Sequence, residues 1–473
     1  MKPSFYLHLL LERIYFEERS VLMEVSKRVR FLGLGLCAVV LLPGPLVAFN
    51  SQTHGCSENP ELSYFLSPKP FQRYPYLVRY ETFLPSTLGK EKGFFVILPE
   101  DYIQNSSAKY PVLFLLHGYN FQRRGLWWEV CYPEKARKIL CEAKEEEYHW
   151  LLHEDIAVVA YAMTDLKNRT YRDLEESLEE RFQELLRYGG LDKGDYSPKE
   201  IAQSIVTHNL YPKGNLSDPY HPIQKMIIIL PDGDNGFYTD ENEGRTLFPE
   251  TKNRKGYDEF NPGEALNFSL FPFLYMKPGA LGKYESYFLE LLRYMDSQSP
   301  YRERVSPIRG LGGISMGGFG AMKLGLKYPQ FFQSMSSQSG LLDIELLNDK
   351  WMLKMILPEF LEVFGRLEPK KIPSGCSLDP KWIEANNPFA LLKKRGLTRL
   401  PHWIYFDYGS KEGFDWINEG NKNVENLLKE GSHQIPVQLS NGKSGHNYKF
   451  WRSRSGNILQ HHSDIFQKGL PLE

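Results

Sequence analysis

The residue whose surroundings most clearly indicate a catalytic role is a serine flanked by glycines. Gly313, Ser315 and Gly317 form a G-x-S-x-G pattern that follows a short apolar run and precedes a helix-like stretch. A strand-to-helix turn this tight leaves no room for neighbouring side chains and lifts the hydroxyl above the end of the strand. The N–H groups of the following helix then favour negative charge beside it. Ser315 is therefore the predicted nucleophile of an acyl-transfer reaction.

A serine hydroxyl attacks only when a base removes its proton. Enzymes with this motif carry their groups in the order serine, acid, histidine, which leaves five histidines to consider. They are His402, His433, His446, His461 and His462. The first opens a strand, the second precedes one, and the last two lie in what we predict to be a polar tail. His446 follows the strand-like run Ile435–Leu439 and is the predicted base.

The acid that orients the histidine should follow the preceding strand, which we place at Trp403–Phe406. Four carboxylates lie beyond it, namely Asp407, Glu412, Asp415 and Glu419. Asp407 ends the strand directly and is predicted to be structural. Glu412 and Asp415 lie in the loop from which a carboxylate can reach the imidazole, so both are candidates.

An oxyanion hole requires two N–H groups beside the serine. The N–H after the serine belongs to Met316, and the second usually comes from the loop after an earlier strand. Here the strand-like run Val112–Leu116 leads into His117, Gly118 and Tyr119. The Tyr119 N–H is the predicted second donor, and His117 is expected to be structural.

The elements that must position these residues alternate along the chain. Short runs rich in Val, Ile, Phe and Leu predict strands buried on both faces, a pattern typical of parallel sheets, at Phe94–Pro99, Val112–Leu116, Met226–Leu230, Leu311–Ile314 and Trp403–Phe406. Helix-like stretches such as Tyr284–Met295 and Gly317–Lys327 lie between them. The pattern predicts an α/β fold with a mostly parallel central sheet flanked by helices. Tyr76–Leu84 is expected to pair with Phe94–Pro99 as an antiparallel hairpin.

Residues 119–223 interrupt this alternation. Helix formers dominate at Glu134–Tyr148 and Tyr171–Tyr188, and a polar stretch follows at Leu191–His221. We predict a mostly helical, cap-like insertion near the site. A separate domain is less favoured, because the segment lacks the apolar periodicity needed for a core of its own.

Several segments resemble the esterase D-like family, which includes S-formylglutathione hydrolases, short-chain acyl, feruloyl and acetyl-xylan esterases, and mycolyl transferases. These segments are LLHGY, PDGDNGFYTD, YESYFLELLRYMD, GISMGGFGAMKLGLKYPQFF and GHNYKFW. The similarity extends from about Tyr76 to Trp451, and Gly313–Phe332 is its most specific part. The resemblance implies an α/β-hydrolase fold, with Ser315 as the nucleophile and His446 as the base.

The same resemblance also implies candidates for the acid of the triad and for substrate binding. The family's acid is usually the second aspartate of D-x-G-x-x-D, a place that Glu412 takes after Asp407, so Glu412 is implied and Asp415 is the alternative. Aromatic residues tend to stand two and five positions after the family's histidine. Tyr448 and Trp451 occupy these places and are candidate substrate-binding residues.

The N-terminus carries the one long apolar run, Phe31–Ala48, which follows a basic patch and contains two prolines. A positive region, an apolar stretch and a small final residue are typical of a secretory signal. We expect residues 1–48 to be an extension plus signal peptide, and residues 49–473 to be an exported catalytic domain. An uncleaved membrane anchor is the alternative.

Composition excludes other classes. The 473 residues carry 57 Lys+Arg and 58 Asp+Glu, a net charge of −1, whereas nucleic-acid binding is usually marked by a basic surplus. Asp232 and Asp234 begin like a calcium loop, but the glycine is misplaced, so we expect an ordinary turn and no metal. Ester hydrolysis with a serine needs no cofactor.

Together these features predict an exported serine esterase that acts through an acyl-enzyme on a small-molecule or glycan-linked ester. Two other functions stay open. One is an acyltransferase with the same triad, and the other is a non-catalytic binding protein on the same fold.

Overall fold

The structure is a computed structural model. It describes residues 78–119, 153–187, 197–208, 215–234, 236–240, 282–347, 363–367, 376–378, 380–395, 403–409, 415–430, 438–442 and 445–469. The chain divides into two units, residues 1–54 and 55–473, and every described residue lies in the second. The predicted signal segment lies outside the described residues.

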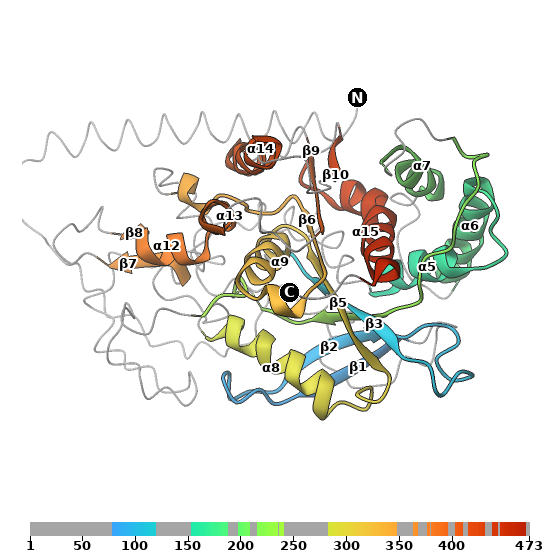
Figure 1. The fold of residues 1–473 in the computed structure, drawn as a ribbon, viewed down its shortest axis with the longest axis horizontal. Helices are drawn as coiled ribbons and strands as arrows, with labels where there is room; N and C mark the ends of the chain where they lie inside the picture. Colours follow the sequence, from blue (N-terminus) through green and yellow to red (C-terminus); the bar gives the residue numbers. More distant parts are fainter. Residues whose placement is uncertain are drawn as a thin grey trace, which may run out of the picture. The chain divides into compact units, whose positions relative to one another are not determined.

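The main sheet of the described part has eight strands in the order β1-β2-β4-β3-β5-β6-β9-β10 (Figure 1). Their bounds are Val78–Phe83 (β1), Lys92–Ile97 (β2), Tyr110–Leu116 (β3), Ile227–Pro231 (β4), Val305–Gly313 (β5), Ser334–Gln338 (β6), Trp403–Gly409 (β9) and Gln438–Gly442 (β10). β2 is antiparallel to both neighbours, which confirms the predicted hairpin with β1, and every other adjacent pair is parallel. This order and direction define the α/β-hydrolase fold that the resemblance implied.

Helices cover both faces of this sheet. They are α5 (His153–Thr164), α6 (Tyr171–Arg187), α7 (Pro198–His208), α8 (Tyr284–Ser297), α9 (Met316–Lys327), α12 (Pro380–Asn386), α13 (Pro388–Arg395), α14 (Asp415–Glu430) and α15 (Tyr448–Lys468). Figure 1 shows α5, α6, α7 and α15 gathered on one side, away from α8 and α9. A short hairpin of Gly365–Leu367 (β7) and Cys376–Leu378 (β8) pairs separately from the main sheet.

The apolar strands build two cores because successive side chains point to opposite faces. On β3, Val112, Phe114 and Leu116 join one core with α8 and α9. Leu113 and Leu115 join the other core with α5, α6, α7 and α15. Strands buried on both faces explain why these runs are continuously apolar.

The described helices of the insertion do not form a cap. α6 confirms the predicted Tyr171–Tyr188 helix, α7 lies within the stretch predicted to be merely polar, and α5 was not predicted. All three contribute to the core beneath the sheet, and α5 is apolar and buried over most of its length. They therefore form a layer of the fold, because their apolar side chains are buried against the strands. The predicted helix Glu134–Tyr148 lies outside the described residues.

The prediction of a polar tail at the C-terminus is wrong. His461 and His462 lie on the long helix α15 and are 5% and 0% exposed. The two ring nitrogens of His462 contact the hydroxyls of Ser334 and Ser336 on β6 at 2.6 and 2.9 Å. Burial, and then His461, holds the pKa of His462 well below its usual range, so the ring is neutral. β6 itself was not predicted, because its buried sequence is rich in serine rather than apolar.

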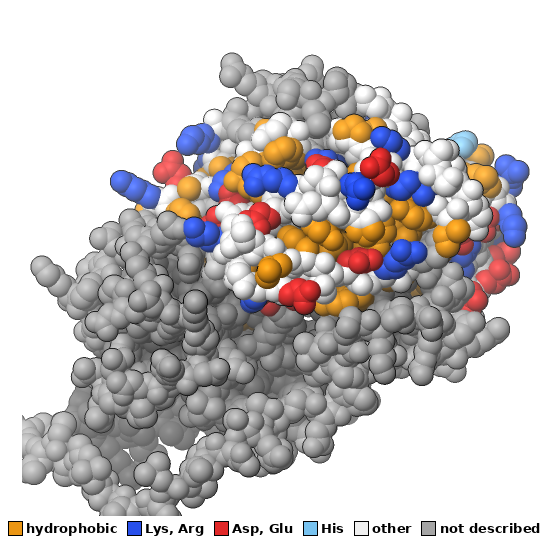
Figure 2. All heavy atoms as spheres, turned by 90° about the horizontal axis from the view of Figure 1, so that it is seen from below, with side chains coloured by type: hydrophobic (Ala, Val, Ile, Leu, Met, Phe, Trp, Pro, Cys, Tyr) orange, Lys and Arg blue, Asp and Glu red, His pale blue; other side chains and the backbone are white. Residues whose placement is uncertain are grey.

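The surface of the described part carries both signs of charge. Figure 2 shows acidic and basic side chains interspersed with apolar ones over the face seen from below. Among the described helices, none is long and apolar enough to cross a membrane.

Candidate active site

Ser315 lies between β5 and α9 with φ 48° and ψ −117°. Non-glycine residues rarely adopt such a backbone, which persists only where the surroundings enforce it. A Cβ on Gly317 would lie 2.0 Å from the carbonyl oxygen of Leu116, and one on Gly313 would lie 2.4 Å from the Gly317 backbone. The Ser315 N–H also donates to the Gln338 carbonyl at 2.8 Å. The predicted strand-to-helix turn around the serine is confirmed.

The structure brings the predicted base to the predicted nucleophile. Oγ of Ser315 lies 2.9 Å from Nε2 of His446. At this distance the hydroxyl can donate to a neutral imidazole, which is then placed to take the proton as the oxygen attacks. Ser315 is 7% exposed and His446 is half-buried, so the pair is largely shielded from solvent.

His446 is placed by the start of α15. Oδ1 of Asn447 accepts from the Phe450 N–H at 3.0 Å and caps the helix. In the first turns the Trp451 ring meets the imidazole edge to face, with centroids 4.8 Å apart and planes at 86°. Trp451 is 5% exposed, so it lies behind the base rather than on an open surface. The side chain of Tyr448, the other candidate for substrate binding, lies outside the described residues.

Of the two candidate acids, the structure describes one. Glu412 lies outside the described residues. Asp415 is the exposed first residue of α14, where a carboxylate is favoured by the helix dipole. Asp407 is buried on β9 and accepts from the Tyr405 hydroxyl at 2.6 Å. Burial, and then the charge of Asp407, raises the pKa of Tyr405 well above its usual range, so the phenol remains a donor. Asp407 thus has a structural contact within the strand.

Two backbone segments meet beside Ser315, where negative charge would develop. Met316 is the first residue of α9, and N–H groups of a first turn have no partner within their helix. The loop after β3 passes close by, since a Cβ on Gly118 would lie 3.5 Å from Cβ of Ser315. Tyr119 follows directly. The segments that carry the two predicted oxyanion donors are therefore brought together.

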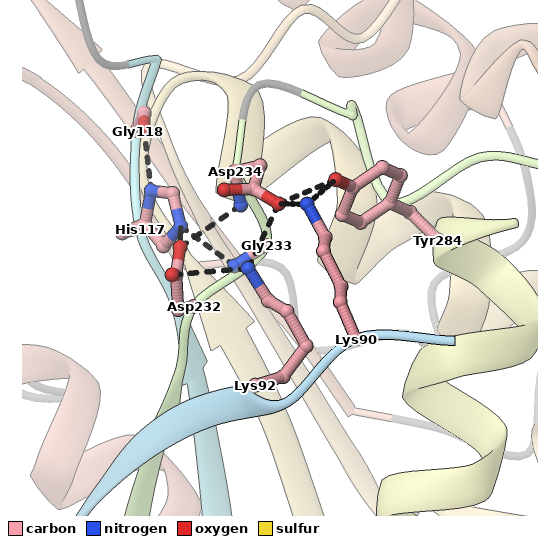
Figure 3. Close-up of polar contacts among 8 residues, drawn as sticks. All are labelled: Lys90, Lys92, His117, Gly118, Asp232, Gly233, Asp234 and Tyr284. Atoms are coloured by element: carbon pink, nitrogen blue, oxygen red, sulfur yellow. Dashed lines mark hydrogen bonds and ion pairs between the residues drawn. The ribbon is translucent and has the colours of Figure 1, made fainter. Parts of the chain in front are cut away.

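The loop after β3 is held by its own histidine. Nε2 of His117 accepts from the Gly233 N–H at 2.9 Å, and Nδ1 lies 2.7 Å from the Gly118 carbonyl oxygen (Figure 3). Because Nε2 accepts, the ring proton lies on Nδ1 and is donated to that carbonyl. His117 thus ties the loop after β3 to the loop after β4, and its predicted structural role is confirmed.

The acidic pair after β4 is neutralised by lysines. Nζ of Lys92 lies 2.8 Å from Asp234 and 3.0 Å from Asp232, and Nζ of Lys90 lies 2.9 Å from Asp234 (Figure 3). The Tyr284 hydroxyl also donates to Asp234. These contacts fit the predicted turn. In the described part of the chain, no group of three or more His, Cys, Asp or Glu side chains is placed to hold a metal ion.

A second buried ion pair supports α9. Nζ of Lys323 lies 2.7 Å from Glu285 and 2.9 Å from the Thr239 hydroxyl, and Lys327 contacts the other oxygen of Glu285. Burial alone would raise the pKa of Glu285, but the charges of Lys323 and Lys327 outweigh it and lower that pKa to about 2. Burial lowers the pKa of Lys323 to about 8. Both partners are therefore charged at pH 7, and they join α8 to the helix that begins at Met316.

The buried residues that support the elements around the site were not predicted from the sequence. Lys92 and Lys323 each lie within an apolar stretch, KGFFVI and GAMKLGL, and each is almost fully buried. A single lysine within such a run is the signal that could have indicated a buried ion pair, since buried lysines are almost always paired. No comparable sequence signal marks Ser339, whose Oγ accepts a hydrogen bond from the indole N–H of Trp451.

Comparison with known proteins matches residues 278–465 to the family described as Putative esterase. No curated protein sequence matches the chain. Among solved structures, the chain is similar to a ferulic acid esterase, with 17% identity and a TM-score of 0.41 over 83% of this chain and 98% of that one. It is also similar to an S-formylglutathione hydrolase from Agrobacterium tumefaciens, with 14% identity and a TM-score of 0.41 over 82% and 95%. The chain is similar as well to a fluorophosphonate-binding serine hydrolase of Staphylococcus aureus, with 14% identity and a TM-score of 0.40 over 82% of this chain and 99% of that one.

The strand order and the serine–histidine pair at a strand-to-helix turn define the class as that of α/β-hydrolase enzymes with a serine nucleophile. Residues 278–465, which include both Ser315 and His446, match the model of the Putative esterase family, in agreement with the resemblance. The chain is a serine esterase.

Proposed function

We propose that this esterase hydrolyses carboxylic esters through an acyl-enzyme. Oγ of Ser315 attacks the carbonyl carbon while its proton moves to Nε2 of His446, and the imidazolium then protonates the leaving alcohol. Water attacks the acyl-enzyme with the same base, which releases the acid and restores Ser315. The 2.9 Å contact between Oγ and Nε2 at the strained turn is the observation that carries this proposal.

The developing oxyanion is stabilised by the N–H groups of Met316 and Tyr119 in this proposal. The proximity of Gly118 to Ser315 supports the second donor. Glu412 orients His446, with Asp415 as the alternative acid. The exposure of Asp415 at the start of α14 favours Glu412.

We further propose that the protein is exported and acts on a small-molecule or glycan-linked ester. The basic patch and the apolar run Phe31–Ala48 support export. Contact with a membrane is expected only if that run is not cleaved.

The test is hydrolysis of p-nitrophenyl acetate, butyrate and octanoate by the full chain, beside Ser315→Ala. Wild type should turn over at least one ester and react with a fluorophosphonate. The variant should lose roughly 10⁵-fold or more in kcat and should not be labelled. A wild type that is folded but neither hydrolyses esters nor reacts with the probe would support a binding protein.

The acid is identified by a matched pair of variants. Glu412→Gln should lower kcat by about 10³- to 10⁴-fold, because the imidazolium loses its orienting charge. Asp415→Asn should leave kcat near that of wild type. The reverse result would assign the role to Asp415.

Acyl transfer is distinguished from hydrolysis by the products. An added acceptor alcohol should leave the yield of free acid nearly unchanged if water is the acceptor. A new ester that grows with alcohol concentration at the expense of free acid would assign the chain as a transferase.

A further inference from the structure

Trp451 connects the catalytic histidine to the core. Its ring contacts the His446 imidazole at 4.8 Å between centroids, and it forms a small buried cluster with Ile314 and Phe450. Ile314 is the residue that precedes the nucleophile. The indole therefore packs between the base and the turn that carries Ser315.

Trp451 is held at two points by Gln338 and Ser339 at the end of β6, once through its indole and once through its backbone. Its Nε1–H donates to Oγ of Ser339 at 3.1 Å, and the Trp451 carbonyl accepts from Nε2 of Gln338 at 3.2 Å. A buried indole N–H needs an acceptor, and this one comes from a residue distant in sequence. The two contacts fix both the ring and the first turns of α15.

Of these two residues, Gln338 also contacts the nucleophile, and Ser339 contacts β9. The Gln338 carbonyl accepts from the Ser315 N–H at 2.8 Å, and the Ser339 N–H donates to the Asp407 carbonyl at 2.7 Å. Ser339 has φ 48°, a left-handed backbone that is costly for a residue with a side chain. Such strain marks a conformation that the surrounding structure enforces, and it is concentrated at functional sites. Here the strained residue aims its hydroxyl at the indole.

We propose that Gln338 and Ser339, acting through Trp451, set the position of His446 relative to Ser315, and that Trp451 is a positioning residue rather than a wall of the substrate pocket. This inference rests on the proposed esterase function. One end of β6 thereby contacts the nucleophile through a backbone hydrogen bond and the base through the indole. A displacement of about 1 Å between such groups can cost about 100-fold in rate.

A positioning role and a substrate-binding role have different kinetic signatures. Loss of positioning lowers kcat for every substrate alike, because the misplaced base affects the transition state and not the bound ester. Loss of a pocket wall changes KM and alters the ranking of esters by chain length.

The experiment compares Trp451→Phe, Trp451→Ala and Ser339→Ala in the full chain. Trp451→Phe keeps an aromatic ring but loses the N–H donor, and Ser339→Ala loses the acceptor. Each should lower kcat by about 3- to 10-fold, the equivalent of one net hydrogen bond. Trp451→Ala should lower it by about 100-fold. KM and the ranking of acetate, butyrate and octanoate should stay as in wild type.

Two controls use the same chemical changes elsewhere. Trp382→Phe alters a half-buried indole on α12, and Ser297→Ala removes an exposed hydroxyl that donates to the Arg293 carbonyl on α8. Both should keep wild-type kcat. Thermal unfolding of every variant shows that the comparison is made among folded proteins.

The double variant Ser339→Ala/Trp451→Phe sharpens the test, because both single changes remove the same hydrogen bond. Its loss in kcat should equal that of either single variant rather than their product. The rate of fluorophosphonate labelling should fall in parallel, since it depends on the same serine–histidine pair.

A multiplicative loss in the double variant, a change confined to KM, or an altered chain-length ranking would overturn the inference. These outcomes are distinct from failure of the proposed function, in which wild type itself would neither hydrolyse esters nor react with the probe.

Discussion

The proposed nucleophile, Ser315, and the proposed base, His446, lie in two regions that are built differently. The elbow region, formed by β5, Ser315 and α9, is held by close backbone contacts at glycines and by the buried charges of Glu285 and Lys323. The base region, formed by β10, His446 and the first turns of α15, is held by side-chain hydrogen bonds from Asn447 and Trp451. The first is part of a core, whereas the second depends on these side-chain hydrogen bonds and on the small buried cluster of Ile314, Phe450 and Trp451.

The difference between the two regions indicates which substitutions should lower stability together with activity and which should lower activity alone. Damage in the elbow region leaves buried charges unpaired or forces atoms together, so it should lower stability as well as activity. Damage in the base region removes contacts of about 1 kcal/mol each, so it should lower kcat while the fold remains. The predictions below test this contrast.

The largest effect is expected from Glu285→Gln. The charge of Lys323 would stay buried without its partner, which should cost about 3–5 kcal/mol of unfolding free energy. Urea unfolding measures this loss. Glu303→Gln is the matched control, because Glu303 is exposed and its surface pair should contribute less than about 1 kcal/mol. Equal stability of the two variants would show that the ion pair between Glu285 and Lys323 does not stabilise the elbow region.

Acid should weaken the same region. The pKa of Glu285 is about 2 in the folded chain and near 4.5 otherwise, so the unfolded chain takes up the proton first as pH falls. The stabilisation is full above pH 4.5 and is lost progressively toward pH 2, a change of about 3 kcal/mol. Unfolding at a series of pH values should therefore show wild type and Glu285→Gln converging in stability below pH 4.5. A constant difference between them would contradict this assignment.

Gly317→Ala should damage the turn directly. Its Cβ would meet the Leu116 carbonyl, so the backbone must shift, at a cost of about 1–3 kcal/mol and with loss of most activity. Gly469→Ala is the control, since Gly469 has φ 57° but open space around it. That variant should lose about 1 kcal/mol and keep wild-type kcat. Normal activity in Gly317→Ala would show that the turn tolerates movement.

The smallest loss of stability is expected in the base region, from Asn447→Ala. Removal of the cap should cost about 1 kcal/mol, and kcat should fall by about 10-fold because His446 precedes the freed helix end. Asn447→Ser keeps a capping oxygen and should restore most of the activity. If Asn447→Ala destabilises the chain more than Gly317→Ala does, the contrast between the two regions is wrong.

The turn of the elbow region and the strands beyond it were predictable because their signals are local. The turn at Ser315 is encoded by adjacent glycines, and the apolar runs of β2, β3 and β4 mark strands buried on both faces. β6 was missed because two of its buried serines, Ser334 and Ser336, bind His462, and a sequence pattern does not show such a contact. For the same reason His461 and His462 on α15 were predicted to lie in a polar tail, since the buried polar residues of this helix have partners on distant elements.

The sequence by itself predicted the turn around Ser315 and the apolar strands beside it, because both depend on residues close together in the chain, and the order of the motifs predicted His446 as the base. Only the tertiary structure decided what holds them in place. The contact of Oγ with Nε2, the pairing of Lys92 and Lys323 with carboxylates, and the place of Trp451 behind the base join segments that are distant in sequence. Such contacts leave little periodic signal in the sequence, because they depend on how strands and helices pack rather than on spacing within one element.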